Sequence, residues 1–383
     1  MSLTTLTEEQ SLFCDTVERT VVRVAPEARV QKLDNAKDFD FELHRALAEL
    51  GVLGLGVSQS MGGSEGGAVE QVLAVEILGR MATSMAVFTV VQFMVTRLLR
   101  DHGTPEQREK YLAPLCRGEI RASFCLTEVG GGTDILGSMR TKARATDTGW
   151  VLNGAKMWIS GATRSDLLVV LARTGNDRRG ISMFLVPAKT PGVIASELRT
   201  LVFNSYDTCE VGFSDVNLPQ DALLGQLDQG FNHVLATLNG ERMNAAAVAI
   251  GIGRGAHQAA VAYARERHAF GRPIGQFQAL QHRLVTIGVD LEAAWMLTMA
   301  AAAKDAADEA TEVISNMAKL AASTAALAAT DAGMEVLGGA GVDMDLPMQR
   351  YFRDIRVYIF APLTNDMVRN LLAERWLGLP RSF

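Results

Sequence analysis

The stretch "SFCLTEVGGGTDILG", residues 123–137, marks the point where the sequence changes its periodicity. Before it, from Thr7 to about Leu115, apolar residues recur at three- and four-residue spacing, which predicts amphipathic helices. After it, from about Ala122 to Leu224, short apolar and β-branched runs alternate with Gly, Asn, Asp and Pro, which predicts strands. From Gly230 onward, long Ala-rich periodic stretches predict a bundle of antiparallel helices.

The fold class expected from this order is α+β. A chain of 383 residues with 48% hydrophobic residues has room for two or three folding units. We expect an N-terminal helical domain over 1–118, a middle β domain over 119–227 and a C-terminal helical domain over 228–383. The strands are predicted in the runs "WVLNGAKMWIS", "DLLVVLAR", "ISMFLVPA" and "CEVGFSDV".

Composition excludes several classes of protein. The net charge of -6 gives no electrostatic case for a nucleic-acid or anionic-membrane partner. Four scattered cysteines fit free thiols in a reducing compartment, and the six histidines show no short metal-ligand spacing, so no metal is expected. The N-terminal stretch carries acidic residues and helical periodicity instead of a signal peptide's basic start and apolar run. The most apolar stretch, "MATSMAVFTVVQFMVTRLL", predicts a buried helix, and we expect a cytoplasmic protein.

Three consecutive glycines in the opening stretch are surrounded by two hydroxyls, Thr127 and Thr133, and by the carboxylate of Glu128. Such a loop lets the backbone approach a flat or phosphorylated ligand without interference from Cβ atoms. A surface turn after a strand has a similar pattern, so both interpretations stay open at this point. A phosphate-binding P-loop is excluded, because no Gly-Lys-Ser/Thr follows, and no Gly-x-Gly-x-x-Gly fingerprint lies between a strand and a helix.

Three further stretches, each in a different segment, accompany this loop. They are "NGAKMWISGA" at 153–162, "RERHAFGRPIGQFQ" at 265–278 and "EVLGGAGVDMDLPMQRYFRDIRVY" at 335–358. Together with the loop they resemble the acyl-CoA dehydrogenase family over nearly the whole chain. The resemblance implies an N-terminal helical domain, a β-barrel-like middle domain and a C-terminal four-helix bundle. It also implies bound FAD, a homotetramer built as a dimer of dimers, an acyl-CoA thioester substrate and an electron-transfer flavoprotein as acceptor.

The resemblance assigns flavin contacts in the middle domain. Phe124, Leu126 and Thr127 match residues that line the pyrimidine side of the flavin, and Trp158 and Ser160 match residues that flank its ring. In the family, the residue at the position of Ser160 hydrogen-bonds the hydride-accepting nitrogen N5. A small hydroxyl can donate without blocking that face of the ring. The alternative for Trp158 is an ordinary residue of the β-domain core.

Three residues of the C-terminal domain match positions that reach the FAD of a neighbouring subunit. They are Arg267, Phe270 and Gln278, with the arginine on the pyrophosphate. A guanidinium has a shape suited to holding phosphate oxygens. Without the resemblance, the Arg- and Glu-rich stretch around Arg267 is typical of a solvated helix end.

Further flavin contacts are implied near the C-terminus. Gly338 and Gly339 match the family's flavin-binding glycine pair, but Glu335 replaces the glutamine usual three positions earlier. A carboxylate beside a pyrophosphate is unfavourable unless it pairs with an arginine or turns away. Thr364 and Asp366 also fall where the family contacts FAD.

On the substrate side, Thr133 matches a serine that contacts the pantetheine arm of CoA. Asn239 and Arg242 stand where polar contacts to the pantetheine and the wall of the site are expected. Val129 stands where proline is usual, a difference that affects the stiffness of the loop more than its chemistry.

The catalytic base is the main departure from the family. Many members carry it as the Glu of a Tyr-Glu-Gly-Thr stretch, and in "FAPLTNDM", residues 360–367, that position is Pro362, which closes the "VYIFA" run expected to be extended. The short side chain of Asp366 reaches the α carbon poorly, so we interpret it as a helix cap or a neighbour of FAD. Isovaleryl-CoA and long-chain relatives carry the base in a Glu-Arg pair, which Glu241 and Arg242 resemble.

The function implied is α,β-dehydrogenation of an acyl thioester, with Glu241 removing the α proton and the β hydride passing to flavin N5. The alternative for Glu241 is a helix-start carboxylate that pairs with a neighbour. Because Pro362 leaves the usual position empty, relatives that eliminate sulfinate, oxidise nitroalkanes or use oxygen are a second possibility. A helical scaffold that binds acyl-CoA without turnover is a third.

Overall fold

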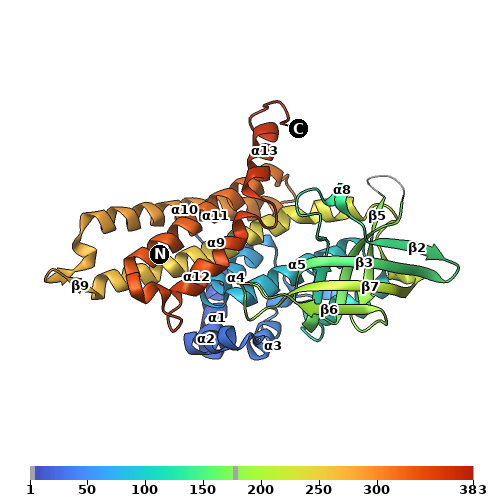
Figure 1. Ribbon diagram of the computed structural model, residues 1–383, viewed down its shortest axis with the longest axis horizontal. Coiled ribbons are helices and arrows are strands. Elements are labelled where there is room, and N and C mark those ends of the chain that lie inside the picture. Colours follow the sequence, from blue (N-terminus) through green and yellow to red (C-terminus); the bar gives the residue numbers. More distant parts are fainter. Residues whose placement is uncertain (1–4, 176–179, 383) are drawn as a thin grey trace. The chain divides into compact units, whose positions relative to one another are not determined.

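The computed structural model describes residues 5–175 and 180–382, and the described chain forms two compact units. Within the described residues, the helical unit comprises 5–36, 68–87 and 239–382, and the sheet unit comprises 37–67, 88–175 and 180–238. Along the chain, helices come first, strands second and helices last, as Figure 1 shows by its colours. The predicted order of a helical, a β and a second helical domain is confirmed.

The helical unit takes its N-terminal helices from two separate stretches of sequence. A capping box starts the first helix, because the Thr7 side chain accepts from the Gln10 amide while the Gln10 side chain accepts from the Thr7 amide. The helices here are α1 (Glu8–Val24), α2 (Glu27–Ala36) and α4 (Ala68–Met81), and α5 (Thr83–His102) begins in this unit.

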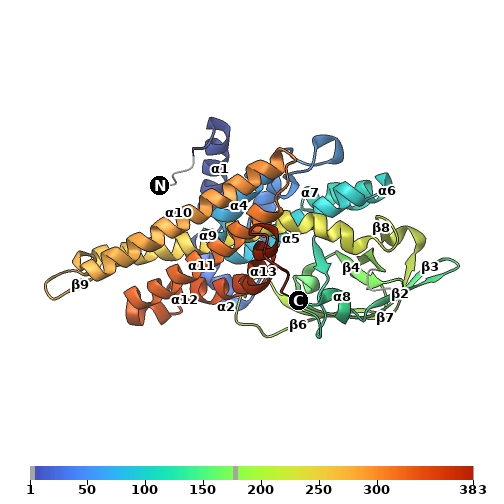
Figure 2. The same cartoon turned by 90° about the horizontal axis from the view of Figure 1, so that it is seen from above.

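The C-terminal part of the helical unit is built on long Ala-rich helices. In both ribbon views α9, α10 and α11 run alongside one another (Figures 1 and 2). Small residues allow this close approach, since a Cβ added at Gly253 of α9 would lie 2.9 Å from the Cα of Ala326 of α11. The elements are α9 (Gly230–Glu266), β9 (His268–Ala269), β10 (Arg272–Pro273), α10 (Gln278–Ala306), α11 (Glu312–Leu337), α12 (Met348–Asp354) and α13 (Asn365–Arg375).

One helix among the described residues, α10, has the length and hydropathy of a membrane span. Core helices of soluble proteins meet the same criteria, so this is weak evidence for a membrane. The stretch that we expected to form a buried helix is α5, in which residues such as Val95, Leu98 and Leu99 are fully buried.

The sheet unit holds a sheet in which the strands follow the order β6-β7-β3-β2-β4-β5-β8, with β1 paired in parallel to β4. The four predicted strand runs are confirmed as β3, β4, β5 and β7. The strands are β1 (Ala122–Cys125), β2 (Lys142–Thr146), β3 (Gly149–Ser160), β4 (Leu167–Arg173), β5 (Ile181–Pro187), β6 (Val193–Glu197), β7 (Thr208–Pro219) and β8 (Leu223–Leu224). Short helices accompany them: α3 (Phe41–Glu49), α6 (Pro105–Gln107), α7 (Ala113–Cys116) and α8 (Ile135–Ser138).

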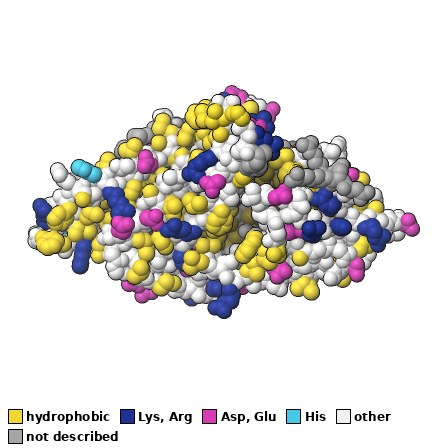
Figure 3. All heavy atoms as spheres, turned by 45° about the horizontal axis from the view of Figure 1, so that its top comes forward, with side chains coloured by type: hydrophobic (Ala, Val, Ile, Leu, Met, Phe, Trp, Pro, Cys, Tyr) yellow, Lys and Arg dark blue, Asp and Glu magenta, His cyan; other side chains and the backbone are white. Residues whose placement is uncertain are grey.

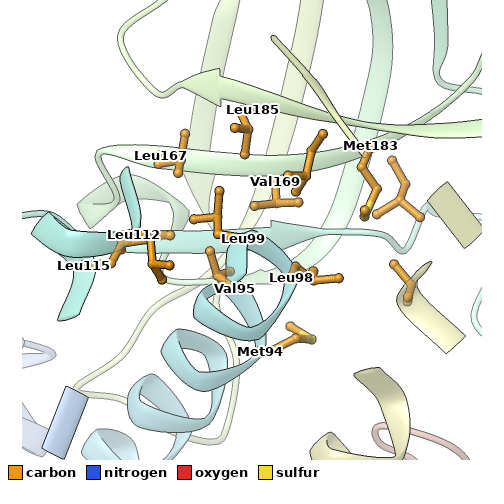
Figure 4. Packing of buried hydrophobic residues seen from close by; sticks show 14 of the residues in the cluster. Met94, Val95, Leu98, Leu99, Leu112, Leu115, Leu167, Val169, Met183 and Leu185 are labelled. Atoms are coloured by element: carbon orange, nitrogen blue, oxygen red, sulfur yellow. The ribbon is translucent and has the colours of Figure 1, made fainter. Parts of the chain in front are cut away.

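One hydrophobic cluster holds the sheet against α5. Figure 4 shows Val95 and Leu99 of α5 among side chains of β4 and β5 such as Val169 and Leu185, all of them buried. Burying one such side chain contributes about 2 kcal/mol, so this cluster is a main source of stability for the sheet unit. It fixes β4, and through the β1–β4 pairing it fixes the strand that leads into the Gly-rich loop.

One local expectation is wrong. The "VYIFA" run is not extended, because residues Ile355–Ile359 form a 3₁₀ helix that continues directly from α12. Its last turn precedes the loop that carries Pro362 and leads into α13.

Candidate active site

The Gly-rich loop lies beside strand β3 in the sheet unit. The Met157 amide donates to the Thr127 carbonyl over 2.9 Å, and the Lys156 ammonium donates to the Leu126 carbonyl over 3.0 Å. Phe124 lies one residue before the end of β1, opposite Val169 of β4. The structure therefore brings the predicted flavin residues of β1, the loop and β3 into one region.

Trp158 projects from an irregularity in β3. Its pairing with β7 shifts register between Lys156 and Ile159, and Trp158 has a φ of +64°. Such bulges redirect a side chain, and a positive φ in a bulky residue is uncommon outside functional positions. The indole is 60% exposed, so Trp158 is not a core residue of the β domain.

Ser160 ends β3 in a tightly constrained position. Its carbonyl accepts a hydrogen bond of 2.6 Å from the Ser123 hydroxyl, and the next residue, Gly161, donates its amide to the Asp207 carbonyl over 2.7 Å. Gly161 has a φ of +72°, and an added Cβ would lie 2.2 Å from the ring of Tyr206. The backbone around Ser160 is thus fixed, while its side chain keeps partial exposure.

The outer face of the Gly-rich loop is open. A Cβ added at Gly130 or Gly132 would meet no atom within 4 Å, and Thr133 is exposed. Thr127 is partly exposed next to them. Thr127, Trp158 and Ser160, which the resemblance assigns to FAD, are thus all exposed or partly exposed in the sheet unit.

Glu241 lies inside α9, well past the first turn that begins at Gly230, so the helix-start interpretation is wrong. Although part of the side chain faces solvent, burial raises the pKa of Glu241 to about 7, and the opposing effect of Arg242 is smaller. Its carboxylate has no hydrogen bond or ion pair within residues 5–175 and 180–382. Glu241 is therefore a carboxylate held ready to take up a proton near neutral pH.

Arg242 and Asn239 lie next to Glu241 on the same helix. The Arg242 guanidinium donates to the Asn239 side-chain oxygen over 2.7 Å and is buried. Burial lowers the pKa of Arg242, whereas Glu241 and Glu312 act in the opposite direction. Arg242 supplies positive charge beside Glu241 without forming a direct ion pair with it.

Lys319 of α11 holds the loop that carries Pro362. Its ammonium donates to the Leu363 carbonyl over 2.6 Å and to the Asn365 side-chain oxygen over 2.7 Å, and its side chain is almost fully buried. Burial lowers the pKa of Lys319 to about 8, and Arg242 contributes to the effect. Sequence reasoning missed this residue. The available signal was a lysine at a position where the Ala-rich periodicity of α11 predicts a buried side chain.

The helix that follows, α13, is capped by Thr364 and not by Asp366. The Thr364 hydroxyl accepts from the Met367 amide over 3.1 Å, whereas Asp366 lies in the first turn and pairs with Arg369 at 3.0 Å. The Asp366 side chain is 90% exposed. Its expected role as a cap is wrong, and contacts of Thr364 and Asp366 with FAD stay predictions.

The predicted intersubunit contacts lie on and beside the β9–β10 hairpin. Phe270 at its tip is 93% exposed with a φ of +52°, while Arg267 and Gln278 flank the hairpin and are also exposed. In Figure 3, hydrophobic side chains gather beside Lys and Arg side chains where Figure 1 places β9. These residues are free to contact a ligand or another subunit, and their role stays a prediction.

The negative charge of Glu335, which is unfavourable beside a pyrophosphate, is compensated by an arginine. Glu335 forms an ion pair with Arg283 of α10, and this hydrogen bond lowers the pKa of Glu335. The adjacent glycines are open, since a Cβ added at Gly338 or Gly339 meets no atom within 4 Å, and Gly338 has a φ of +58°. A phosphate group near these glycines would therefore meet a neutralised carboxylate.

In the described part of the chain, no group of three or more His, Cys, Asp and Glu side chains is arranged to hold a metal ion. Glu241, Arg242 and Lys319 belong to the helical unit, whereas Thr127, Trp158 and Ser160 belong to the sheet unit.

Comparison with known proteins decides the family. Models of the acyl-CoA dehydrogenase N-terminal, middle and C-terminal domains match residues 7–119, 123–216 and 228–377. The mitochondrial short/branched chain specific acyl-CoA dehydrogenase of Rattus norvegicus is 31% identical over 377 residues, which cover 97% of this chain and 86% of that protein. The chain belongs to the acyl-CoA dehydrogenase family.

Solved structures of acyl-CoA dehydrogenases agree in fold. Butyryl-CoA dehydrogenase from Megasphaera elsdenii superimposes with a TM-score of 0.93 at 30% identity, covering 98% of this chain and 99% of that one. A glutaryl-CoA dehydrogenase from Mycobacterium smegmatis in complex with FADH2 gives 0.93 at 27% identity, covering 99% and 96%. The protein is a flavin-dependent acyl-CoA dehydrogenase, and its cofactor is FAD.

Proposed function

We propose that Glu241 is the base that removes the α proton of the acyl-CoA thioester. The observation that carries this proposal is a partly buried carboxylate with a pKa of about 7 and no ion-pair partner among the described residues, in a chain that has Pro362 where many relatives have glutamate. A base works best when its pKa is near the working pH, because it is then both ionised and basic. Asp366 is a poor alternative, since it is exposed and paired with Arg369.

Other side chains prepare the site for this step. Arg242, held by Asn239, places a buried positive charge next to the base and favours the ionised form of Glu241. Lys319 fixes the loop around Pro362 through Leu363. When bound, FAD supplies the acceptor for the β hydride, and the Ser160 hydroxyl is available on the flavin side to donate a hydrogen bond.

The natural acceptor of electrons in this proposal is an electron-transfer flavoprotein, and the assembly is a homotetramer. An exposed apolar face on α10 supports an assembly, because Val285, Val289 and Met296 are each more than half exposed. Covering such a face with another subunit removes apolar surface from water. In this proposal Thr133 contacts the pantetheine arm of the substrate. We also propose that the protein is cytoplasmic.

A second function keeps the fold and changes the chemistry, and the proline at position 362 is the observation that favours it. Sulfinate elimination from a CoA thioester, for example, causes no net change in the redox state of the flavin. The two functions are separated by anaerobic titration of the purified holoenzyme with straight and branched acyl-CoAs and, in parallel, with an acyl-CoA that carries a sulfinate group. Loss of oxidised-flavin absorbance together with a 2-enoyl product supports dehydrogenation, whereas substrate consumption without flavin bleaching would favour the second function.

A further inference from the structure

A buried ion pair lies behind the Gly-rich loop, and neither proton abstraction nor any predicted ligand contact uses it. Lys156 of β3 is fully buried and Glu128 of the loop is nearly so, with 2.8 Å between the ammonium and a carboxylate oxygen. Charged side chains are rarely buried this completely, because leaving water costs more than most ion pairs return. The presence of a buried pair is therefore not in itself evidence that the pair stabilises the fold. Its role is indicated by its other contacts.

Both carboxylate oxygens of Glu128 accept hydrogen bonds from backbone amides at the far end of the loop. The Arg140 amide donates to one oxygen over 2.6 Å, and the Thr141 amide donates to the other over 3.0 Å. At the near end, Lys156 donates to the Leu126 carbonyl over 3.0 Å. One ion pair therefore closes the loop of residues 126–141 on itself and attaches it to β3.

These contacts stabilise the charge of Glu128, whereas burial lowers the pKa of Lys156. Burial alone raises the pKa of Glu128, but Lys156 and the hydrogen bonds from Thr141 and Arg140 outweigh it, so the pKa falls below its ordinary value. Charge-assisted hydrogen bonds to backbone amides are stronger than neutral ones. They hold the chain in one conformation where three consecutive glycines would otherwise allow many.

We propose that the Glu128–Lys156 pair is the positioning device that holds the loop of residues 126–141 in its FAD-binding conformation. This inference rests on the assignment of the loop to FAD and is independent of whether Glu241 is the base. With the carboxylate directed inward to amides, the outer face of the loop is left with open glycines and the hydroxyls of Thr127 and Thr133. A loop ordered in only a tenth of the molecules binds its ligand about tenfold more weakly.

The test uses full-length protein in three variants. Glu128→Gln keeps the size of the side chain but replaces one accepting oxygen by an NH2 group. That group would face the Lys156 ammonium or a backbone amide, which are themselves donors. Glu128→Leu combined with Lys156→Leu removes both charges and leaves the amides of Arg140 and Thr141 without their acceptor. The control is Asp166→Asn, because Asp166 also accepts from a backbone amide and pairs with an arginine in the sheet unit, but it does not contact the loop.

Three quantities are measured for each variant: the Kd of the apoprotein for FAD, hydrogen–deuterium exchange in the peptide of residues 126–141, and Tm. We expect Glu128→Gln to raise the Kd at least about tenfold and to speed exchange in that peptide. The double leucine variant should recover part of the Tm lost in Glu128→Gln, since it leaves no unpaired charge buried, yet keep the weak FAD binding and fast exchange. Asp166→Asn should bind FAD as the parent does.

The discriminating result comes from the double leucine variant. Parental FAD affinity with slow exchange in this variant would overturn the proposal, because it would show that the pair only fills the core. If Glu128→Gln does not fold, the double leucine variant still tests the proposal. Glu241→Gln should leave the Kd for FAD and the exchange of residues 126–141 at parental values, so a wrong assignment of the base is distinguishable from a wrong assignment of the loop.

Discussion

Replacing Glu241 with glutamine should stabilise the protein above pH 7 while removing its catalytic function. In the folded chain burial raises the pKa of Glu241 from 4.5 to about 7, so the folded state binds the proton more tightly than the unfolded state. The stability associated with the protonated carboxyl is fully present below pH 4.5 and is lost as the pH rises through 7. Glutamine is neutral throughout and avoids this loss.

The size of the effect follows from the two pKa values. Their difference corresponds to roughly 3 kcal/mol, an upper limit because Glu241 keeps part of its surface in water. For a chain of 383 residues the entropy of unfolding is about 0.8 kcal/mol per kelvin. The Tm of Glu241→Gln should therefore exceed the parental Tm by up to about 4 °C at pH 8.5, with the difference vanishing toward pH 4.5.

The assay is thermal unfolding of FAD-saturated protein at a series of pH values, followed by far-UV circular dichroism. Asp366→Asn is the matched control, because it removes an exposed carboxylate from the same unit, and its effect should stay small and constant across the series. A Glu241→Gln variant with a lower Tm than the parent at pH 8.5 would refute the reasoning. A difference in Tm that is the same at every pH would refute it as well. The carboxylate would then be stabilised in the folded state.

Three further outcomes are expected. The rate of flavin reduction by acyl-CoA should fall about tenfold from pH 8 to pH 6, because the ionised fraction of a base with a pKa near 7 falls by that factor; a flat stopped-flow profile would contradict it. Lys319→Met should lower the free energy of unfolding by about 2 kcal/mol, since Leu363 and Asn365 lose a buried donor, and denaturant titration measures this. Arg267→Ala should weaken FAD retention and tetramer assembly together, and an unchanged gel-filtration profile with full flavin content would count against that role.

Periodicity and turn residues were sufficient to predict the order of the elements. The alternation of apolar runs with Gly, Asn and Pro located β3, β4, β5 and β7, because turn residues bound each run. In β4 and β5 the run is continuous, since these strands are buried on both faces. Glu241 could be singled out because the usual glutamate position holds Pro362. Both inferences depend on residues close together in the sequence or on a match to a family.

What the sequence did not predict depends on contacts between distant residues. Trp158 is exposed because its strand changes register against β7, and no local pattern reports on the partner strand. Glu335 is neutralised by Arg283, which lies 52 residues earlier on another helix. The "VYIFA" run has the composition of a strand, but its place after α12 lets it continue as a 3₁₀ helix. Tertiary context decided each of these cases.

The measurement that tests the central claim most directly is the rate of flavin reduction in Glu241→Gln under anaerobic conditions. The account predicts that the variant keeps FAD and binds acyl-CoA, while the rate falls by about 10² to 10⁴, the usual cost of removing a general base. Reduction at close to the parental rate, with substrate binding intact, would show that another group removes the α proton and that Glu241 is not the base.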